Sequence, residues 1–585
     1  LATRYSLLAL IFLLMQGITF KANAQLVVSL KITDPIFGNA KGDNNETSSD
    51  DNTEAFIKAG YYFSSLNLAP GEWAELIIPS YYPENSNNLA TYYVGKQIST
   101  LNSYSVTVTD ANNNSVTKTF NAGSNVRAGI DDMLYIENTN NSIVIRGGDA
   151  SNSPIIRYRN NLLFGSFLNP NQLYERYEPN IVLPVYSYTN LSQNIIPLPQ
   201  EAWQWAVEGD NVKCWIGNFI GISNSQNITI KDLILDGNNS HFIWGGIFSD
   251  KGIQLPHSGI SCRNATHINI ENVISNQFGL DGIVLLTNNY DIKLTDCVFN
   301  KNTRCGFGYT GGEKILATNC DFNETGRNNI AVLSNPGAGL DIEPDCDTKD
   351  IYGNCISAIL CKNGRFINCR FNNNRGCNIV SDKFMANFVE DMYFQECTTH
   401  KVEEYGLWCM GKKFEFNKCH IYCSVVNSGK GLNDIDKTMY IECDFEDKPF
   451  NGMSWDHNHP LIKIDGNVFK MDRTAFQKCT FKVNDKDREF FYLNWNTNNL
   501  LESDYTVIDH CTFTYNNEGH PGENPSFIRG VKFKGSNKIE NIKNGLNSYH
   551  LFNTREILIE GSGNPCSPNL FTLEGQVEHL YFGND

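Results

Sequence analysis

Cysteines recur at one phase of a repeat along the second half of this chain. Each follows a short β-type run, and the shortest spacings between them are 22, 23 and 24 residues. The residues at this phase are Cys297, Cys320, Cys369, Cys397, Cys419, Cys443, Cys479 and Cys511, and Leu233 and Val273 continue the frame toward the N-terminus. A period in the low twenties is typical of a solenoid, in which each coil buries its inner face only against its neighbours.

The chemistry of the repeat predicts strands and turns. Its short runs are rich in Ile, Val, Phe and Thr, and Asn and Gly cluster between them. Leucine-rich repeats have a similar period, but their recurring Leu framework is absent here. The sequence therefore predicts a right-handed parallel β-helix. Asn300, Asn323 and Asn372 follow the aromatic residue of their coils, which predicts an asparagine ladder from coil to coil.

A second strand of each coil can be aligned on its glycine. Because side chains alternate along a strand, this alignment separates inward from outward residues. The predicted inward row is Ile283, Phe307, Leu340, Cys377 and Leu407, and the predicted outward row is Val284, Gly308, Asp341, Asn378 and Trp408. Gly308 and Thr310 are expected to leave open space on the outer face beside Asp341.

The N-terminus reads as a secretory leader. Arg4 precedes the apolar run LLALIFLLM, and Ala22-Asn23-Ala24 fits a signal-peptidase site, so residues 1–24 are expected to be removed on export from a bacterial cell. No later run of about 18 apolar residues predicts a membrane span. The net charge of −17 and the pI near 5.2 argue against binding to a nucleic-acid backbone.

The remaining chain is expected to form one long solenoid. Residues 25–95 are predicted to form an N-terminal cap and first coil, and residues 96–585 the β-helix. Segments that break the coil pattern are predicted as insertions near 170–210, 240–258, 344–362, 444–475 and 514–530.

The repeat also bears on the redox state of the cysteines. Residues stacked on parallel strands lie about 4.8 Å apart, whereas disulfides prefer Cβ separations of about 3.5–4.5 Å. The phased cysteines are therefore expected to be reduced and to act as small core hydrophobes. Cys346 and Cys355 bracket the insertion CDTKDIYGNC, and either a disulfide or two free thiols fits there.

Two segments carry a resemblance to a known superfamily. The run Asp50-Asp51-Asn52-Thr53-Glu54-Ala55-Phe56 predicts a helix with Asp or Thr at its N-cap, and Ile77-Ile78-Pro79-Ser80-Tyr81-Tyr82 follows it. This order resembles the start of the pectate-lyase-like superfamily, although Ser80 stands where that pattern has Gly. The central GLDIEP segment is similar to bacterial right-handed β-helix repeat proteins. The resemblance implies a parallel β-helix that acts on a carbohydrate polymer.

The superfamily's reaction motifs are not matched. The N-T-D, G-H-G and R-I-K segments of polygalacturonases are absent, and Asp341-Ile342-Glu343-Pro344 stands where alginate epimerases carry D-P-H. Ile508-Asp509-His510 and Trp455-Asp456-His457 are incomplete versions of the W-I-D-H segment of pectate lyases. The resemblance therefore specifies the fold more closely than the reaction.

Asp341 and Glu343 are the predicted catalytic pair. They are two residues apart on one strand, so both are expected to point outward with Cα atoms about 6.5–7 Å apart. Rotation of the side chains reaches either separation used by glycosidases, about 5–5.5 Å or 6.5–9.5 Å. One alternative is a structural pair held by Arg304 and Arg327. Another is a calcium site that also includes Asp345 and Asp347.

The predicted substrate-binding residues surround this pair. Arginines suit acidic sugars, and an exposed tryptophan suits stacking on a sugar ring. These residues are Arg304, Arg327, Arg375, Asn378, Trp408 and Tyr309. Equally, the arginines could serve only in a salt-bridge ladder to Glu324 and the acids of residues 341–347, and Trp408 could only cover an insertion.

The sequence therefore predicts an exported glycoside hydrolase that needs no cofactor, with calcium as an option, and whose partner is a polysaccharide. The first alternative is a polysaccharide lyase for uronate polymers, with His257, Lys383 or Tyr309 as its base. The second is a glycan-binding β-helix without catalysis. Asp281, which precedes Gly282, is expected only to cap a turn.

Overall fold

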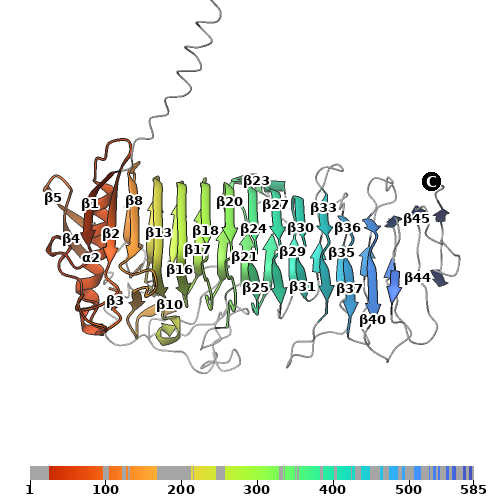
Figure 1. The fold of residues 1–585 in the computed structure, drawn as a ribbon, viewed down its shortest axis with the longest axis horizontal. Helices are drawn as coiled ribbons and strands as arrows, with labels where there is room; N and C mark the ends of the chain where they lie inside the picture. The colour runs from red at the N-terminus through yellow and green to blue at the C-terminus, as the bar shows by residue number, and fades with distance from the viewer. Residues whose placement is uncertain are drawn as a thin grey trace, which may run out of the picture.

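Parallel strands stack into a long rod whose axis runs from the N-terminal to the C-terminal end (Figure 1). This computed structural model describes residues 25–96, 104–120, 127–128, 132–167, 212–214, 216–244, 257–327, 334, 336–349, 351, 355–381, 387–400, 405–422, 425–427, 437–447, 461–465, 474–484, 491–494, 506–515, 526–527, 531–534, 538–540, 549–552, 556–560, 571–574 and 579–582. The rod is a right-handed parallel β-helix, as the sequence predicts. The predicted leader, Lys383 and the predicted 170–210 insertion lie outside the described residues.

Three parallel sheets form the walls of the rod within the described residues. The largest sheet has eighteen strands, the second twelve and the third seven. The eighteen are β1 (Gln25–Lys31), β2 (Glu72–Ile78), β3 (Thr91–Val94), β8 (Ser142–Gly147), β9 (Ile155–Tyr158), β13 (Gln226–Asp236), β16 (Thr266–Asn276), β18 (Tyr290–Thr295), β20 (Gly312–Thr318), β24 (Cys361–Ile367), β27 (Val389–Gln395), β30 (Lys412–Asn417), β33 (Thr438–Ile441), β36 (Thr474–Gln477), β39 (Thr506–Asp509), β42 (Val531–Lys534), β45 (Glu556–Glu560) and β47 (His579–Phe582).

The twelve-stranded sheet carries the predicted site. Its strands are β7 (Asp132–Glu137), β12 (Asn218–Ser223), β15 (Ile260–Arg263), β17 (Asp281–Leu286), β19 (Cys305–Tyr309), β21 (Ala338–Ile342), β26 (Cys377–Ser381), β29 (Tyr405–Cys409), β32 (Val425–Asn427), β35 (Ile462–Asp465), β38 (Phe491–Asn494) and β41 (Ser526–Phe527). The seven-stranded sheet contains β25 (Arg370–Asn372), β28 (Thr398–His400), β31 (His420–Tyr422), β34 (Asp444–Glu446), β37 (Thr480–Val483), β40 (Thr512–Tyr515) and β43 (Lys538–Glu540).

Smaller elements decorate the rod. They are the hairpins β4 (Tyr104–Thr109) with β5 (Ser115–Phe120) and β22 (Cys346–Lys349) with β23 (Cys355–Ala358), the parallel pair β44 (Tyr549–Phe552) with β46 (Phe571–Glu574), and a sheet of β6 (Arg127–Ala128), β10 (Leu163–Phe167), β11 (Val212–Cys214) and β14 (Ile243–Trp244). The described residues also include the 3₁₀ turns η1 (Pro35–Phe37), η2 (Glu46–Ser48) and η4 (Asn239–His241).

The predicted N-terminal helix is confirmed as α2 (Ser49–Ser64), which packs against β7 at the N-terminal end of the solenoid. Its N-cap residue is Ser48, whose side chain makes no capping hydrogen bond, so the expected Asp or Thr cap is wrong. Thr53 instead donates to the carbonyl of Ser49 from within the helix. Among the described residues, no helix is long and apolar enough to cross a membrane.

The predicted cysteine row is confirmed along its whole length. All of its cysteines are free and buried, and each backbone carbonyl from Cys297 to Cys479 accepts the N–H that follows the next cysteine in the row, at 2.8–2.9 Å. Leu233 and Val273 continue the row at its N-terminal side. The thiols donate to backbone carbonyls; Cys397, for example, donates to Phe366 across 3.3 Å.

Each coil turns at a residue in the left-handed backbone region, directly before the cysteine row. The φ angles there lie between 51° and 58°. The corner residues are Asp232, Asn272, Asp296, Asn319, Asn368, Glu396, Lys418, Glu442, Lys478 and His510. This conformation is uncommon outside Gly, Asn and Asp, and its recurrence shows that the coil geometry imposes it. Asp509-His510 is therefore an ordinary corner.

Two side-chain ladders support the coils. The asparagine ladder is confirmed: Asn300 Oδ1 accepts from the N–H of Asn323 at 3.1 Å, and Asn323 Oδ1 accepts from that of Asn372 at 2.7 Å. Aromatic rings stack inside the large sheet, with centroids 4.7–5.0 Å apart, from Phe366 through Phe394, Phe416 and Tyr440 to Phe476. Stacked aromatic rings add to the burial that stabilises neighbouring coils.

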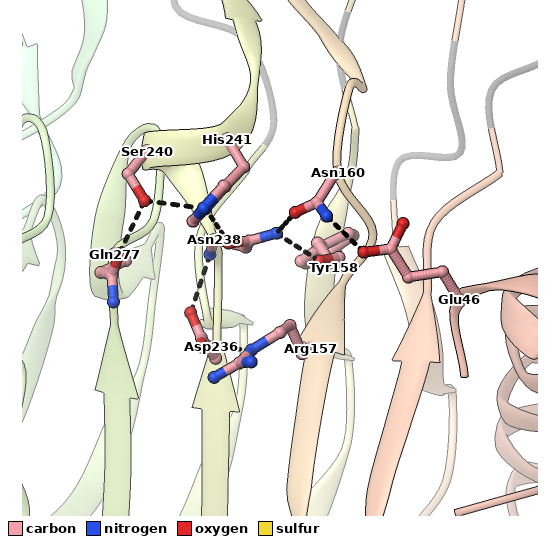
Figure 2. A network of polar contacts seen from close by, with 9 residues as sticks. All are labelled: Glu46, Arg157, Tyr158, Asn160, Asp236, Asn238, Ser240, His241 and Gln277. Carbon is pink, nitrogen blue, oxygen red and sulfur yellow. Dashed lines mark hydrogen bonds and ion pairs between the residues drawn. The ribbon is translucent and has the colours of Figure 1, made fainter. Parts of the chain in front are cut away.

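A polar network ties the N-terminal cap to the first coils (Figure 2). Asn238 Nδ2 donates to the carbonyl of Tyr158 at 2.7 Å and to Asn160 Oδ1 at 3.0 Å, and Asn160 contacts Glu46 of η2. On the same corner, Arg157 Nε pairs with Asp236 Oδ2 at 2.7 Å. These contacts cross-link segments far apart in sequence, and we assign them a structural role.

Candidate active site

One outward row of the twelve-stranded sheet brings the predicted catalytic strand beside a glycine. Val284, Gly308 and Asp341 pair across β17, β19 and β21, and Val380 and Trp408 continue the row on β26 and β29. Trp408 is half-buried and lies two strands from Asp341, about 9.6 Å along the stacking direction. The predicted places of Gly308, Asp341 and Trp408 in this row are confirmed.

The predicted place of Asn378 is wrong. Leu340 pairs with Ile379, so Val380 and not Asn378 lies beside Asp341, and Ile379 replaces Cys377 in the inward row. Asn378 is buried and accepts a hydrogen bond from Asn374 Nδ2 at 2.9 Å. The glycine alignment failed because a Cβ on Gly376 would lie 1.9 Å from the carbonyl oxygen of Pro336, so this glycine serves the corner before the strand.

The expected open space over Gly308 is occupied by a buried ion pair. Arg304 Nε donates to Asp281 Oδ1 at 3.0 Å, and their side chains are 6% and 0% exposed. A Cβ on Gly308 would lie 3.2 Å from Asp281 Oδ2 and 3.3 Å from Arg304 Nη2. Arg304 is therefore not available to a substrate, and Asp281 is a buried partner of an arginine and not only a turn cap.

Three carboxylates follow one another at the end of β21. Asp341 is buried, 3% exposed, and its Oδ2 lies 3.6 Å from the thiol of Cys305. Glu343 is half-buried, and Asp345 keeps more of its surface exposed. The exposure of these acidic side chains therefore increases along the chain, from the buried Asp341 through Glu343 to the exposed Asp345.

Asp345 is held in a defined position by Thr310. The Thr310 hydroxyl donates to Asp345 Oδ2 at 3.0 Å, and the Asp345 N–H donates to the Thr310 carbonyl at 2.8 Å. Asp345 is exposed as a residue, but neighbouring groups partly shield its carboxyl from water, and this partial desolvation raises its pKa. The Thr310 hydrogen bond and the charges of Arg263 and Arg304 lower the pKa and only partly offset this effect. A carboxyl group with a raised pKa is suited to donate a proton.

Two of the three proposed lyase bases are enclosed in the core. The Tyr309 hydroxyl donates to the carbonyl of Gly312 at 2.6 Å and accepts from the N–H of Lys362 at 3.0 Å, and the side chain is fully buried. His257 lies among the rings of Tyr158, Phe164, Phe242 and Phe278. Neither Tyr309 nor His257 can reach a substrate, so these two predictions are wrong.

The two other predicted arginine ligands lie in turns between strands. Arg327 and Arg375 are half-buried, in the turn after Glu324 and at the corner before β26. Glu324 pairs with Lys301 at 3.7 Å. In the described part of the chain, no three His, Cys, Asp or Glu side chains gather as a metal-binding group. Calcium binding by Asp345 and Asp347 stays a prediction, and no step below involves a metal.

Sequence reasoning missed Arg263 as a part of the site, and it missed the hydrogen bond from Thr310 to Asp345. Arg263 is exposed at the end of β15 and pairs with Leu286 of β17. Arg263 could have been found by extending the strand alignment one coil toward the N-terminus, because ISCR (residues 260–263) aligns with IVLL (residues 283–286). Thr310 was aligned correctly, but its hydrogen bond to Asp345 depends on the path of the chain after Pro344.

Comparison with known proteins supports the architecture alone. No family model and no curated protein sequence matches the chain. Similar solved structures include the A-module of the Azotobacter vinelandii mannuronan C-5 epimerase AlgE4, with 11% identity, a TM-score of 0.39 and coverage of 85% of this chain and 99% of that one. The tailspike protein gp49 from Pseudomonas phage LKA1 has 13% identity and a TM-score of 0.38, over 94% and 81% of the two chains.

A hyperthermoactive exopolygalacturonase from Thermotoga maritima is also similar, with 11% identity and a TM-score of 0.31, over 95% of this chain and 93% of that one. The parallel sheets of the described residues form the β-helix that the resemblance implied. At these TM-scores the comparisons carry no argument about the reaction.

Proposed function

We propose that this protein is a polysaccharide-active enzyme, and that it is a glycoside hydrolase with its active site at the end of β21. The observation that carries the proposal is the arrangement of Asp345, whose carboxyl has a raised pKa and an anchoring hydrogen bond from Thr310, next to a second, half-buried carboxylate on Glu343. An acid and a base of this kind are the groups that glycoside hydrolysis requires.

The proposed roles differ in one point from the sequence prediction. Asp345 donates the proton to the glycosidic oxygen, because its carboxyl is the one for which a raised pKa favours the protonated form. Glu343 serves as the base or nucleophile. Asp341 is too deeply buried to touch a polymer and acts as a positioning residue behind Glu343. Its position beside the thiol of Cys305 anchors the strand.

Substrate contacts are proposed along the same outer face. Trp408 supplies a ring for stacking two strands away, and the exposed Arg263 supplies a positive charge on the other side of Asp345. Arg327 and Arg375 are retained as further candidates. The predicted leader implies export, which suits a polymer substrate outside the cell. The lyase alternative is less supported, since His257 and Tyr309 are enclosed.

The test is an activity screen on neutral, uronate and sulfated polysaccharides, with the products assayed for new reducing ends and for the ultraviolet absorbance of unsaturated uronates. Reducing ends without unsaturated product, lost in Glu343→Gln and Asp345→Asn, support the hydrolase. The matched control is Glu313→Gln, an acid-to-amide change at an exposed residue of β20, which should keep full activity. Unsaturated product would support the lyase, and no cleavage on any polymer would overturn the enzyme and favour glycan binding.

A further inference from the structure

A disulfide-closed hairpin begins at the residue next to Asp345. Cys346 and Cys355 form a disulfide with Cα atoms 5.8 Å apart, which confirms one of the two predicted states of this pair. The strands β22 and β23 that it joins are antiparallel, with Cys346 opposite Ala358 and Lys349 opposite Cys355. The cross-link therefore joins the two strands of the hairpin, and the first of these strands, β22, begins directly after Asp345.

The base of this hairpin holds the backbone of Asp345 from both sides. Its N–H donates to the Thr310 carbonyl at 2.8 Å, and its carbonyl accepts the N–H of Ile359 at 3.0 Å. The returning strand is then tied to the solenoid, because the Gly312 N–H donates to the carbonyl of Leu360 at 2.9 Å. Asp345 thus lies between the end of one coil and the returning arm of the hairpin.

Packing at the base is close, whereas the outer part of the hairpin packs little. A Cβ on Gly311 would lie 2.7 Å from Ile359 Cγ2 and 2.4 Å from the Thr287 carbonyl oxygen, so only glycine fits beneath the returning arm. By contrast, Ile351 is 91% and Ile356 61% exposed. Burial of apolar side chains therefore contributes little to keeping the arms together, and the cross-link and the short ladder remain to do so.

We propose that the hairpin closed by Cys346 and Cys355 is the positioning element that fixes Asp345 against Thr310, so that activity depends on the oxidised state of this disulfide. The proposal rests on the proposed role of Asp345. Opening the cross-link takes two electrons and two protons, which a dithiol reductant supplies while it becomes a disulfide itself, and it leaves two free thiols.

Release of the hairpin has a defined consequence at the site. Once Ile359 leaves the Asp345 carbonyl, the backbone of Asp345 is held from one side only, and its carboxyl can leave the Thr310 hydroxyl. The proposed proton donor then no longer has a fixed position beside Glu343. A displacement of about 1 Å from the productive position costs on the order of 10²-fold in rate.

Hydrogen–deuterium exchange tests the positioning without relying on activity. The variant is the double substitution Cys346→Ser and Cys355→Ser, and the matched control is Ile351→Ser at the exposed part of the hairpin, which leaves the disulfide intact. Faster exchange at the amides of Asp345 and Ile359 in the double variant alone, at an unchanged midpoint of thermal unfolding, is the expected result. Wild-type exchange at both amides would overturn the proposal.

The kinetics of polymer cleavage separate this proposal from the proposed function. A loss of about 10- to 100-fold in kcat in the double variant, at a KM close to that of wild type and without a loss in Ile351→Ser, supports the link to Asp345. Faster exchange at a wild-type kcat would show that the hairpin holds Asp345 but that Asp345 is not the proton donor, and would overturn the dependence of activity on the disulfide. If the wild type cleaves no polysaccharide, the proposed function fails, while exchange still decides whether the hairpin positions Asp345.

Discussion

Arg304 and Asp281 form an ion pair across one coil step, with Nε and Oδ1 3.0 Å apart and both side chains removed from solvent. The pair lies over Gly308, directly beside the strand that carries Asp341. It therefore covers the outer face of β19, next to the strand that leads to the candidate site. A buried pair of this kind is costly to break from one side only, because the remaining charge stays in the core without this partner.

Breaking this pair is predicted to destabilise the fold strongly. Asp281→Asn and Arg304→Met should each lower the free energy of unfolding by about 3–5 kcal/mol. The double variant should cost less than the sum of the two, because it leaves no isolated charge. Urea denaturation of the three variants measures this. Additive losses below about 1 kcal/mol each would contradict a buried, coupled pair.

Asp345→Asn is predicted to lower activity without lowering stability. The folded-state pKa of Asp345 is raised above its unfolded value, so the folded state binds this proton more tightly. The resulting stability is fully present below the unfolded pKa and is lost as pH rises through the folded pKa. At neutral pH the charged carboxylate is therefore a cost that Asn removes, and the midpoint of thermal unfolding should equal or exceed that of wild type. A clearly lower midpoint would show that the carboxylate is structural.

His257 is predicted to make the fold sensitive to mild acid. Its Nδ1 accepts the N–H of Gly279 at 2.6 Å, and complete burial among aromatic rings keeps its pKa well below the ordinary value. As the pH falls below about 6.5, His257 binds a proton in the unfolded chain but not in the folded chain. The free energy of unfolding is therefore highest above about pH 6.5 and decreases below it. The contribution of this residue is about 1.4 kcal/mol per pH unit until the folded pKa is reached.

The measurement for His257 is urea denaturation at pH 7 and pH 5. The loss of stability between these pH values should be smaller in His257→Gln than in wild type. The matched control is His510→Gln, at an exposed corner, which should keep the wild-type pH dependence. The same pH dependence in all three proteins would mean that His257 is already protonated in the folded state.

The cysteine row is predicted to be reduced but unreactive in the folded protein. Burial raises the pKa of the Cys369 thiol and those of Cys397 and Cys479, and a protonated, enclosed thiol is a poor nucleophile. Alkylation with iodoacetamide, followed by peptide mass spectrometry, should label the row only after unfolding. Labelling of Cys397 or its neighbours under native conditions would indicate coils that open readily.

The periodic parts of this structure could be predicted from the sequence, because stacking repeats the same environment in each coil. Cys297 and Cys320 share one phase because each coil buries an apolar side chain at that position, and Asn300 and Asn323 recur because each accepts a hydrogen bond from the next coil. The left-handed backbone of the residue before each position of the cysteine row could not be predicted in this way. Residues as different as Asp296 and Lys418 adopt this left-handed backbone.

The site was predicted only in part, because its contacts depend on where inserted segments return. The glycine alignment misplaced Asn378, since Gly376 serves a corner and not a strand. The rings of Phe164 and Phe242, which enclose His257, come from segments outside the repeat. The repeat gave no indication that Thr310 and the hairpin after Asp345 would meet around that carboxyl group.

The most direct test of the account is the pH dependence of polymer cleavage by wild type, Asp345→Asn and the control Glu313→Gln. Wild-type activity should fall as pH rises through the raised pKa of Asp345, and Glu313→Gln should follow the same curve. Asp345→Asn should be slower by about 10²- to 10⁴-fold and should lack this limb. A wild-type rate and an unchanged profile in Asp345→Asn would contradict the assignment of the active site to the end of β21.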